Sequence, residues 1–447
     1  MTTYFYALLA TWFTIAISTG SFAQAPDLSG WQRFGDPTLD SLIATGLREN
    51  ADLKVAVNRL QEARLRTQLA ETFLKPSVLL TPNLSTQSLT PNRPFQLATV
   101  SDAQRQRFQF NTFSVPFTAS YELDLFNRIR QTIRVNDFQA QATEADYQSV
   151  RLLVAAEIAR IYALVRTNDA EQTVFRRTIL ARDSTVAIIR ERARVGLISQ
   201  IDVQRAEIDV ASLRVQVRTL ERSRTELVNG LAQLLGLDPG AFTLSPGSLP
   251  TTLPQIPFAT VPPDLVRRRP ELQAADRLTQ AADANVNIAR ALRKPRIALA
   301  GSAGFLSGQI GPLFLPSSAT YLLGINASVP VFEGGRNQKN VVLADQQVQT
   351  AQSAYQQRFQ VAQREAEVAL DNYTLLRQQV SEQAQVLELA RRTQYYNREL
   401  YVRGLTTYLD VLDAQRTVLT TEQMLVQLQG QVVVQAVALL RALGGDL

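Results

Sequence analysis

The chain contains the same series of sequence segments twice. Residues 50–76 align without a gap on residues 269–295, and residues 196–206 align in the same way on residues 404–414. Identical residues in the first alignment include Leu53 and Leu272, Ala56 and Ala275, Gln61 and Gln280, and Pro76 and Pro295. Because the segments also occur in the same order, we expect two similar structural units, in which each element of one half has a counterpart in the other.

The composition excludes most catalytic and metal-binding chemistry. The 447 residues include no Cys and no His, which removes thiol nucleophiles, disulfides, histidine bases and the usual zinc ligands. No nucleophile and base occur in a pattern typical of a hydrolase, so we expect no enzyme, cofactor or metal site. The net charge is +6, but the Arg residues are scattered among acidic residues in helical stretches. That pattern is typical of solvated helix faces and does not favour a nucleic-acid site.

The N-terminus has the features of a secretory signal peptide. Residues 7–17 are largely apolar, and Ser21-Phe22-Ala23 is a small-x-small cleavage site, so we assign residues 1–23 to the signal. The segment before the apolar run has no Lys or Arg, which leaves an uncleaved anchor as an alternative. No Cys is available for a lipid anchor. No later stretch holds 18 apolar residues, so a role in a membrane requires β-strands.

Four segments alternate between apolar and polar residues, as strands with one apolar face do. The clearest runs from Phe113 to Leu125, where every second residue is apolar or aromatic. The other strands are weaker in pattern but recur at matching places in the two halves. We predict strands at about residues 77–89, 112–125, 296–306 and 320–331, paired as two hairpins.

Each hairpin is followed by a very long helical run and a returning helix. The run from Gln131 to Arg192 contains no Pro or Gly, and at 1.5 Å per residue it extends about 90 Å. Gly196 and Gly404 are at the positions where glycine ends helices, and Ser199 and Thr407 are good N-caps for the returning helices. We predict long helices at about residues 130–192, 200–235, 336–402 and 408–443, besides shorter ones at 37–47 and 52–74.

These elements divide the chain into two repeats. We assign residues 24–237 to the first repeat, residues 238–262 to a Pro-, Thr- and Ser-rich linker, and residues 263–447 to the second repeat. The last helix has apolar residues at helical spacing on two faces, which indicates a neighbour on each side. Such helices with polar faces between the apolar ones suit a curved wall that is wetted on both sides.

Four strands cannot form a membrane-spanning barrel alone. Known barrels have at least about eight strands, and an open sheet edge in lipid leaves backbone N–H and C=O groups unpaired. We therefore expect the chain to oligomerise, with twelve strands from three copies or eight strands from two. The fold class predicted in this way is mainly α, with a transmembrane β-barrel and a long α-helical barrel that two or three copies form together.

At this point the sequence resembles a known family, the TolC-like outer membrane efflux proteins, and most closely the branch that serves RND-type pumps (the OprM and NodT group). The resemblance covers nearly the whole mature chain. It is carried by Trp31-x-x-Phe34-Gly-Asp-Pro37, by Pro263-Asp-Leu-Val-Arg-Arg-Arg-Pro270, by Asp124-Leu-Phe126-Asn-Arg128 and Val331-Phe332-Glu-Gly-Gly-Arg336, and by Tyr401-x-x-Gly404 with residues 409–414.

The resemblance implies a passive duct with several partners. It implies a homotrimer in outer-membrane lipid with a twelve-stranded barrel, a periplasmic adaptor, an inner-membrane RND-type pump, and export of small molecules such as drugs, toxic compounds or metal ions. An exit duct for type I protein secretion has the same fold and remains an alternative. A periplasmic adaptor, a coiled-coil scaffold and a hydrolase each fail to explain two repeats with two strand pairs. This chain departs from many members of the branch in lacking an N-terminal lipid-anchored Cys.

The residues with candidate functional roles lie at the two helix turns. The resemblance implies that Asp202, Asp410, Asp413 and Tyr401 line the periplasmic aperture. The same turns, at Gly196, Ser199, Gly404 and Thr407, are expected to dock the adaptor. An alternative for Asp202 and Asp410 is helix capping, because Ser199-x-x-Asp202 and Thr407-x-x-Asp410 have the spacing of capping boxes. Arg205 stands in the first half where the second half has Asp413.

Overall fold

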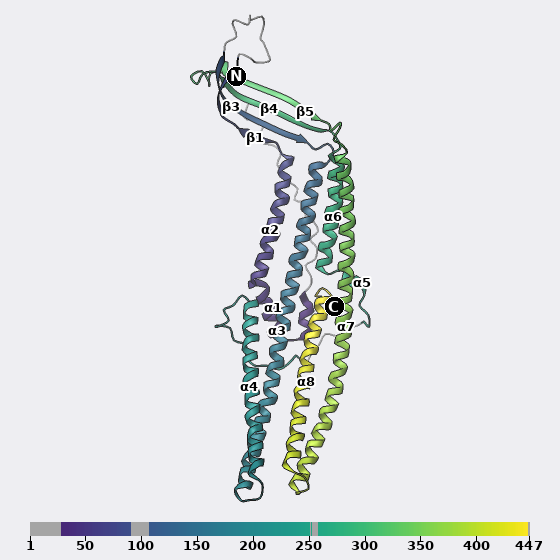
Figure 1. Cartoon of the computed structure of the whole chain (residues 1–447). Helices are drawn as coiled ribbons and strands as arrows, with labels where there is room; N and C mark the ends of the chain where they lie inside the picture. Colours follow the sequence, from purple (N-terminus) through teal and green to yellow (C-terminus); the bar gives the residue numbers. More distant parts are fainter. Residues whose placement is uncertain (1–27, 91–106, 251, 253–257, 446–447) are drawn as a thin grey trace.

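The protein is an elongated molecule with a small sheet at one end and helix turns at the other (Figure 1). The computed structural model describes residues 28–90, 107–250, 252 and 258–445, so the predicted signal peptide and most of the loop after residue 90 lie outside the described residues. The main elements in chain order are α1 (Pro37–Glu49), α2 (Ala51–Glu71), β1 (Ser77–Leu80), β2 (Asn83–Leu89), β3 (Phe108–Leu123), α3 (Arg128–Arg194), α4 (Gln200–Leu234), α5 (Pro263–Arg267), α6 (Pro270–Ala291), β4 (Arg296–Ser307), β5 (Ala319–Ser328), α7 (Arg336–Val402) and α8 (Tyr408–Ala442).

The sequence duplication is visible as two equivalent sets of helices. Helices α3 and α7 run along the molecule, α2 and α4 lie one above the other beside α3, and α6 and α8 do so beside α7 (Figure 1). In the first half, Asn50 Nδ2 donates to the Leu234 carbonyl over 2.8 Å, and Asn50 Oδ1 accepts from the Leu53 N–H. This one side chain therefore caps α2 and holds it to the end of α4. In the second half, Gly444 lies against the backbone of Arg269, at the start of α6.

The strands form one antiparallel sheet in the order β1-β3-β4-β5, in which β2 also pairs with β3. The predicted strand at 77–89 is thus interrupted, because Pro82 has no N–H to donate. The predicted end of the second strand was two residues too late. Asp124 instead accepts hydrogen bonds from the N–H groups of Ile129 and Arg130 at 2.9 Å, so it caps α3. The last strand ends at Ser328 rather than at residue 331, and Pro330 lies in the part that does not pair.

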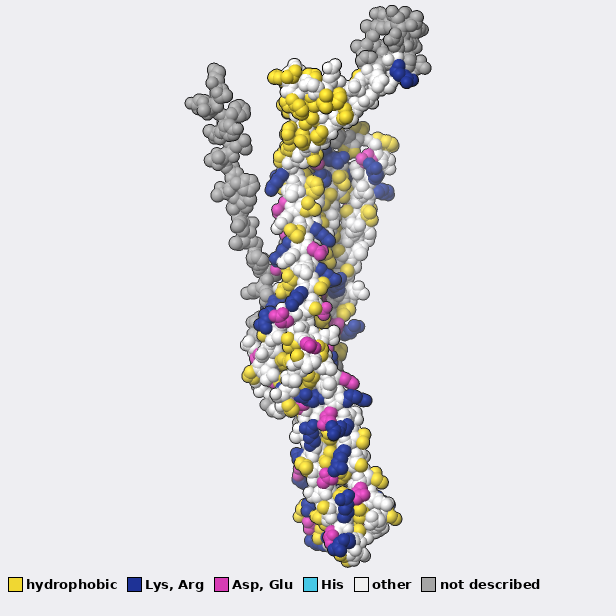
Figure 2. Space-filling view, turned by 90° about the vertical axis from the view of Figure 1, so that its left-hand side faces the viewer, with side chains coloured by type: hydrophobic (Ala, Val, Ile, Leu, Met, Phe, Trp, Pro, Cys, Tyr) yellow, Lys and Arg dark blue, Asp and Glu magenta, His cyan; other side chains and the backbone are white. Residues whose placement is uncertain are grey.

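The register of the sheet gathers its apolar side chains on one face. Three rows cross β3, β4 and β5, and they consist of Phe117, Ala303 and Tyr321, of Ala119, Gly301 and Leu323, and of Tyr121, Leu299 and Ile325. Tyr321 and Leu323 are each 81% exposed, and Figure 2 shows the hydrophobic side chains gathered over this end of the molecule. An exposed apolar face of this kind on an antiparallel sheet is typical of strands that face lipid.

The largest core lies where α2 meets α4 and α6 meets α8. It contains Trp31, Tyr162 and Tyr373, each no more than 2% exposed, together with aliphatic residues of α1, α3, α7 and α8. Tyr162 donates a hydrogen bond of 2.5 Å to the Asp36 carboxylate, which itself caps α1. The N-terminal segment is thereby attached to the centre of α3.

Helix α8 is apolar on two sides, as the sequence predicts. It packs against α7 and α3. Among the described helices it is also the one that is long and apolar enough to cross a membrane, and 39% of its most apolar window is buried within the chain. Its packing against two neighbouring helices accounts for that composition without a membrane.

Candidate functional site at the helix turns

The two turns that end the long helices have the same backbone geometry. Gly196 and Gly404 have φ angles of 78° and 74°. The N–H of Leu197 bonds to the carbonyl of Arg192, and that of Leu405 bonds to the carbonyl of Leu400, both over 2.9 Å. These bonds satisfy carbonyls at the helix ends and define Schellman motifs. Left-handed φ is the reason for glycine at both positions, because nothing lies within 4 Å of the place that a Cβ would occupy.

The second turn contains a complete capping box. The Thr407 hydroxyl accepts from the Asp410 N–H, and the Asp410 carboxylate accepts from the Thr407 N–H over 3.0 Å. The same carboxylate oxygen accepts from the hydroxyls of Thr406 and Thr407, each over 2.6 Å. The hydroxyl donors, with the backbone donor, lower the pKa of the Asp410 carboxyl to about 2, from 3.8. Capping, the alternative role weighed for Asp410, is therefore present in the structure.

The first turn is capped differently. The Ser199 hydroxyl accepts from the Ile201 N–H over 3.2 Å, and the reciprocal bond predicted from Asp202 is replaced by another contact. The Asp202 carboxylate lies 3.7 Å from Nη1 of Arg205, the residue that replaces the second acid of the other turn. The capping alternative weighed for Asp202 is therefore not seen in the structure, where its carboxylate lies towards Arg205.

The two remaining candidates differ in exposure. The Asp413 side chain is 65% exposed, and its closest cation is Arg416 at 4.0 Å. Tyr401 lies with its ring 5.9 Å from the ring of Tyr408, and its hydroxyl is buried without a hydrogen-bond partner in the described part of the chain. Asp413 thus offers a carboxylate to solvent, whereas Tyr401 belongs to the packing between the turns.

An apolar cluster joins the two turns. It includes Ile189 of α3, Val203 and Ala206 of α4, and Tyr408 and Leu412 of α8, all of them buried. Residues of both repeats therefore meet at this end of the molecule, and the turn of one repeat cannot move without disturbing packing around the other.

A buried ionic cluster lies next to these residues, and the sequence did not predict it. Arg182 of α3 forms an ion pair with Asp209 of α4, and the Asp209 carboxylate also lies 2.9 Å from Nε of Arg416 on α8. The side chains of Arg182 and Asp209 are 7% and 5% exposed. Asp209 lies three residues after Ala206, but the apolar 3-4 series of α4 continues unbroken through Val210 and Leu213, so α4 alone gave no signal of the ion pair.

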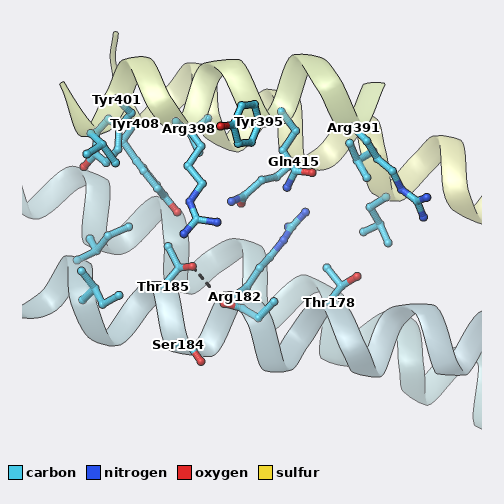
Figure 3. Close-up of a pocket in the computed structure, with 18 of the residues that line it drawn as sticks. Thr178, Arg182, Ser184, Thr185, Arg391, Tyr395, Arg398, Tyr401, Tyr408 and Gln415 are labelled. Carbon is cyan, nitrogen blue, oxygen red and sulfur yellow. Dashed lines mark hydrogen bonds between the residues drawn. The ribbon is translucent and has the colours of Figure 1, made fainter. Parts of the chain in front are cut away.

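A groove of about 730 Å³ separates α3 from α7 beside this cluster (Figure 3). Its lining is rich in Arg, Tyr and aliphatic side chains. In the described ranges no group of three His, Cys, Asp or Glu side chains has the arrangement of a metal site.

Comparisons with known proteins agree with this geometry. The family model described as outer membrane efflux protein matches residues 42–237 and 261–445. The chain is 30% identical over 428 residues to the solvent efflux pump outer membrane protein SrpC of Pseudomonas putida, covering 92% of this chain and 86% of that protein. It is 28% identical over 421 residues to the cation efflux system protein CusC of Escherichia coli strain K12, covering 93% and 89%.

A solved structure of the outer-membrane channel OprN has the same fold. It superimposes with a TM-score of 0.84 at 26% identity, over 95% of this chain and 93% of that chain. The predicted fold class and the predicted function as an efflux channel are confirmed. The chain belongs to the outer membrane efflux protein family, whose members are channels of the outer membrane and not enzymes.

Proposed function

We propose that three copies of this chain form the exit duct of a tripartite efflux pump. The duct receives small molecules from an inner-membrane RND-type pump through a periplasmic adaptor, and it conducts them passively to the outside. The names of SrpC and CusC, a solvent efflux pump protein and a cation efflux system protein, support this assignment. Because those names cover different cargoes, we place the choice of cargo in the pump and not in the duct.

The open sheet is the observation that carries the proposal. Within the described residues, β5 pairs with β4 along one edge alone, and all ten of its residues are exposed. Unpaired backbone groups in lipid cost several kcal/mol each, so about ten residues of open edge exclude a lone chain in a membrane. Pairing β5 with β1 and β2 of the next copy removes both edges. Three copies then give a barrel large enough to hold an aqueous channel.

The helices support the same assembly. Helix α4 exposes Ile201, Ile208 and Val215 at seven-residue spacing, and each is at least 58% exposed in the single chain. Helix α7 exposes Val386, Leu389 and Tyr396 on one side. Seven-residue and 3-4 spacings are those of packed helix seams. We place α4 of one copy against α7 of the next, which closes the helical wall.

We assign the aperture of the duct to the acidic residues and the tyrosine at the helix turns. In the trimer, three Asp413 carboxylates surround the axis at the mouth, with Asp410 and Asp202 near them and Tyr401 packed behind. A ring of acids attracts cations and resists anions. The tips at Gly196, Ser199, Gly404 and Thr407 are the most distant from the sheet and form the docking surface for the adaptor.

Bilayer recordings test the channel directly. The purified protein is expected to migrate as a heat-sensitive trimer and to form ion-conducting pores that a trivalent cation blocks from the turn side. Asp413→Asn should weaken this block. Glu226→Gln removes an acid that is 73% exposed in the half of α4 remote from the turn, and it should leave the block unchanged. A monomeric protein without conductance contradicts the duct, and equal block in both variants contradicts the aperture.

A gene deletion tests the pump partnership. Loss of the chain should raise sensitivity to organic solvents, drugs or metal ions, and crosslinks from cysteines placed at Ser199 or Thr407 should capture an adaptor. Unchanged sensitivity together with loss of a secreted protein would instead indicate type I secretion.

A further inference from the structure

The groove between α3 and α7 has an excess of positive charge. Its lining contains five arginines and one glutamate. Glu422 lies 2.7 Å from Arg177 and 2.9 Å from Arg391, so this single acid serves two guanidinium groups. Two more cations, the half-buried Arg192 on α3 and the exposed Arg398 on α7, form no ion pair with any described residue. Charges of one sign therefore line both walls of the groove.

The fifth arginine is buried at the base of the groove. Arg182 is 6% exposed, its terminal nitrogens have almost no accessible surface, and one of them is in direct contact with the Asp209 carboxylate. Asp209 is shared with Arg416. Burial lowers the pKa of Arg182 to about 10, and the nearby charge of Arg416 acts in the same direction. Two guanidinium groups thus share one carboxylate, so Arg182 adds positive charge behind the groove without presenting a donor to it.

The rest of the lining is apolar and aromatic. Ile188, Val402 and Val418 contribute aliphatic surface, and the Tyr395 ring lies beside Arg398. In Figure 3, Arg398 extends from α7 and Arg182 extends from α3 into the same space. The volume of about 730 Å³ is within the range of small-molecule sites, which combine an apolar lining with a few convergent polar groups.

We propose that this groove binds an organic anion that has an oxyanion head and an apolar or aromatic body. The head lies between Arg398 on one wall and Arg192 on the other, with the charge of the buried Arg182 behind them, and guanidinium groups match the geometry of sulfonate, carboxylate or phosphate oxygens. The body lies against Tyr395 and the aliphatic residues. Because the head contacts α3 and α7 together, binding also holds the two helix pairs in their present arrangement. This site is independent of the export function proposed above.

Calorimetric titration with naphthalene-1,5-disulfonate tests the site on the purified full-length protein. This probe has two oxyanions on an aromatic body and little tendency to enter detergent micelles. We expect one probe molecule per chain, and competition by inorganic sulfate at higher concentration. Arg192→Gln combined with Arg398→Gln should weaken binding about tenfold or more, the effect of losing charge-assisted hydrogen bonds. We expect the double variant to keep its fold, because neither side chain forms an ion pair or hydrogen bond with the described residues, and circular dichroism checks this.

The matched control is Arg222→Gln, which removes an arginine that is 76% exposed on α4, outside the groove. It should bind the probe as the wild type does. The probe should also raise the thermal unfolding midpoint of the wild type and the control, and not that of the double variant. Absence of saturable binding to the wild type, equal affinity in the double variant, or equally tight binding of the trimethylphenylammonium cation would each overturn the proposal.

Discussion

Helices α3 and α7 are counterparts in the duplicated chain, yet their surroundings differ. Both have 67 residues, and both follow a strand at the same point of the repeat. Helix α3 has twenty-five buried residues, whereas α7 has eight. The reason is position, because α3 packs against α1, α2, α4, α6 and α8, while α7 packs against α5, α6 and α8. Among the described elements, α6 and α8 of the second repeat pack against α3, whereas the main neighbours of α7 all belong to its own repeat. We expect the exposed side of α7 to contact another copy in the proposed trimer.

The ionic cluster shows how far the two halves have diverged. With α3 aligned on α7 and α4 on α8, Arg182 corresponds to Ala390, and Asp209 corresponds to Thr417. The second half therefore has no equivalent of the buried pair. The buried Arg182 of α3 requires an ionic partner, whereas Ala390 at the same position of α7 does not. Four substitutions follow from these differences, and we order them by the size of the expected effect.

The largest effect is expected from Asp209→Ala. It leaves Arg182 buried without its ionic partner, which costs about 3–5 kcal/mol for a buried pair broken on one side. Amide hydrogen exchange in α3 near the turn should report this loss as easier local opening. Thr417→Ala, at the corresponding exposed position of α8, should change the exchange rates little. If both variants exchange at the same rate as the wild type, the cluster does not stabilise the first half.

Leu389→Asp tests the uncovered face of α7. Leu389 is 62% exposed in the single chain, and burying a leucine in an assembly contributes about 1.5–3 kcal/mol at each of three interfaces. The variant should therefore fold but fail to form the trimer, as measured by light scattering in detergent. Ala384→Asp places the same charge on another exposed side of α7 and should remain trimeric. A trimeric Leu389→Asp protein would show that this face of α7 is not an interface.

Valine at Gly404 tests the turn of the second hairpin. A left-handed φ costs an L-residue about 1–2 kcal/mol, and more when the residue is β-branched. We expect faster amide exchange at the end of α7 and weaker efflux in cells, with the same result for Gly196→Val in the first half. Gly311→Val is the control, since Gly311 also has open space around it but lacks a positive φ. Normal efflux and exchange in both turn variants would show that the turns tolerate strain.

The smallest effect is expected from lowering the pH, which protonates the Asp410 carboxylate that caps α8. The folded-state pKa of Asp410 is about 2, below its ordinary value of 3.8. A lowered carboxyl pKa stabilises the folded turn above about pH 4, and that contribution is lost as the pH falls from 4 to 2. Amide exchange at the start of α8, corrected for its intrinsic pH dependence, should rise in this window. Asp410→Asn should remove the pH dependence. A wild-type turn without acid sensitivity contradicts the cap as described.

The elements could be predicted from the sequence because their signals are local. The alternation from Phe113 to Leu125 identified a strand, and Gly196 and Gly404 marked helix ends that the structure has as Schellman motifs. The family resemblance then supplied the channel fold. The break of the first strand at Pro82 was not predicted, although the proline is present in the sequence of that weakly patterned strand.

Features that depend on contacts between distant segments could not be predicted. The Asp202 carboxylate lies near Arg205, whereas the Asp410 carboxylate accepts a hydrogen bond from the Thr407 N–H. The same sequence spacing is compatible with either contact, so it could not distinguish them. The cluster of Arg182, Asp209 and Arg416 joins three helices, so no single helix reveals it. The arginine groove likewise depends on residues of two helices, such as Arg192 and Arg398, that are about 200 residues apart in the chain.

The meeting of α2 with α4 and of α6 with α8 has a mechanical consequence. At that level, two of the four helical columns are continuous in covalent structure, α3 and α7, and the other two are interrupted. The interrupted columns are joined by the side chain of Asn50 in one half and by packing of Gly444 on Arg269 in the other. A rotation of the turns is therefore transmitted to the sheet through the two continuous helices, α3 and α7, and through two non-covalent contacts. We expect these contacts to be strained before the hydrogen bonds between the strands.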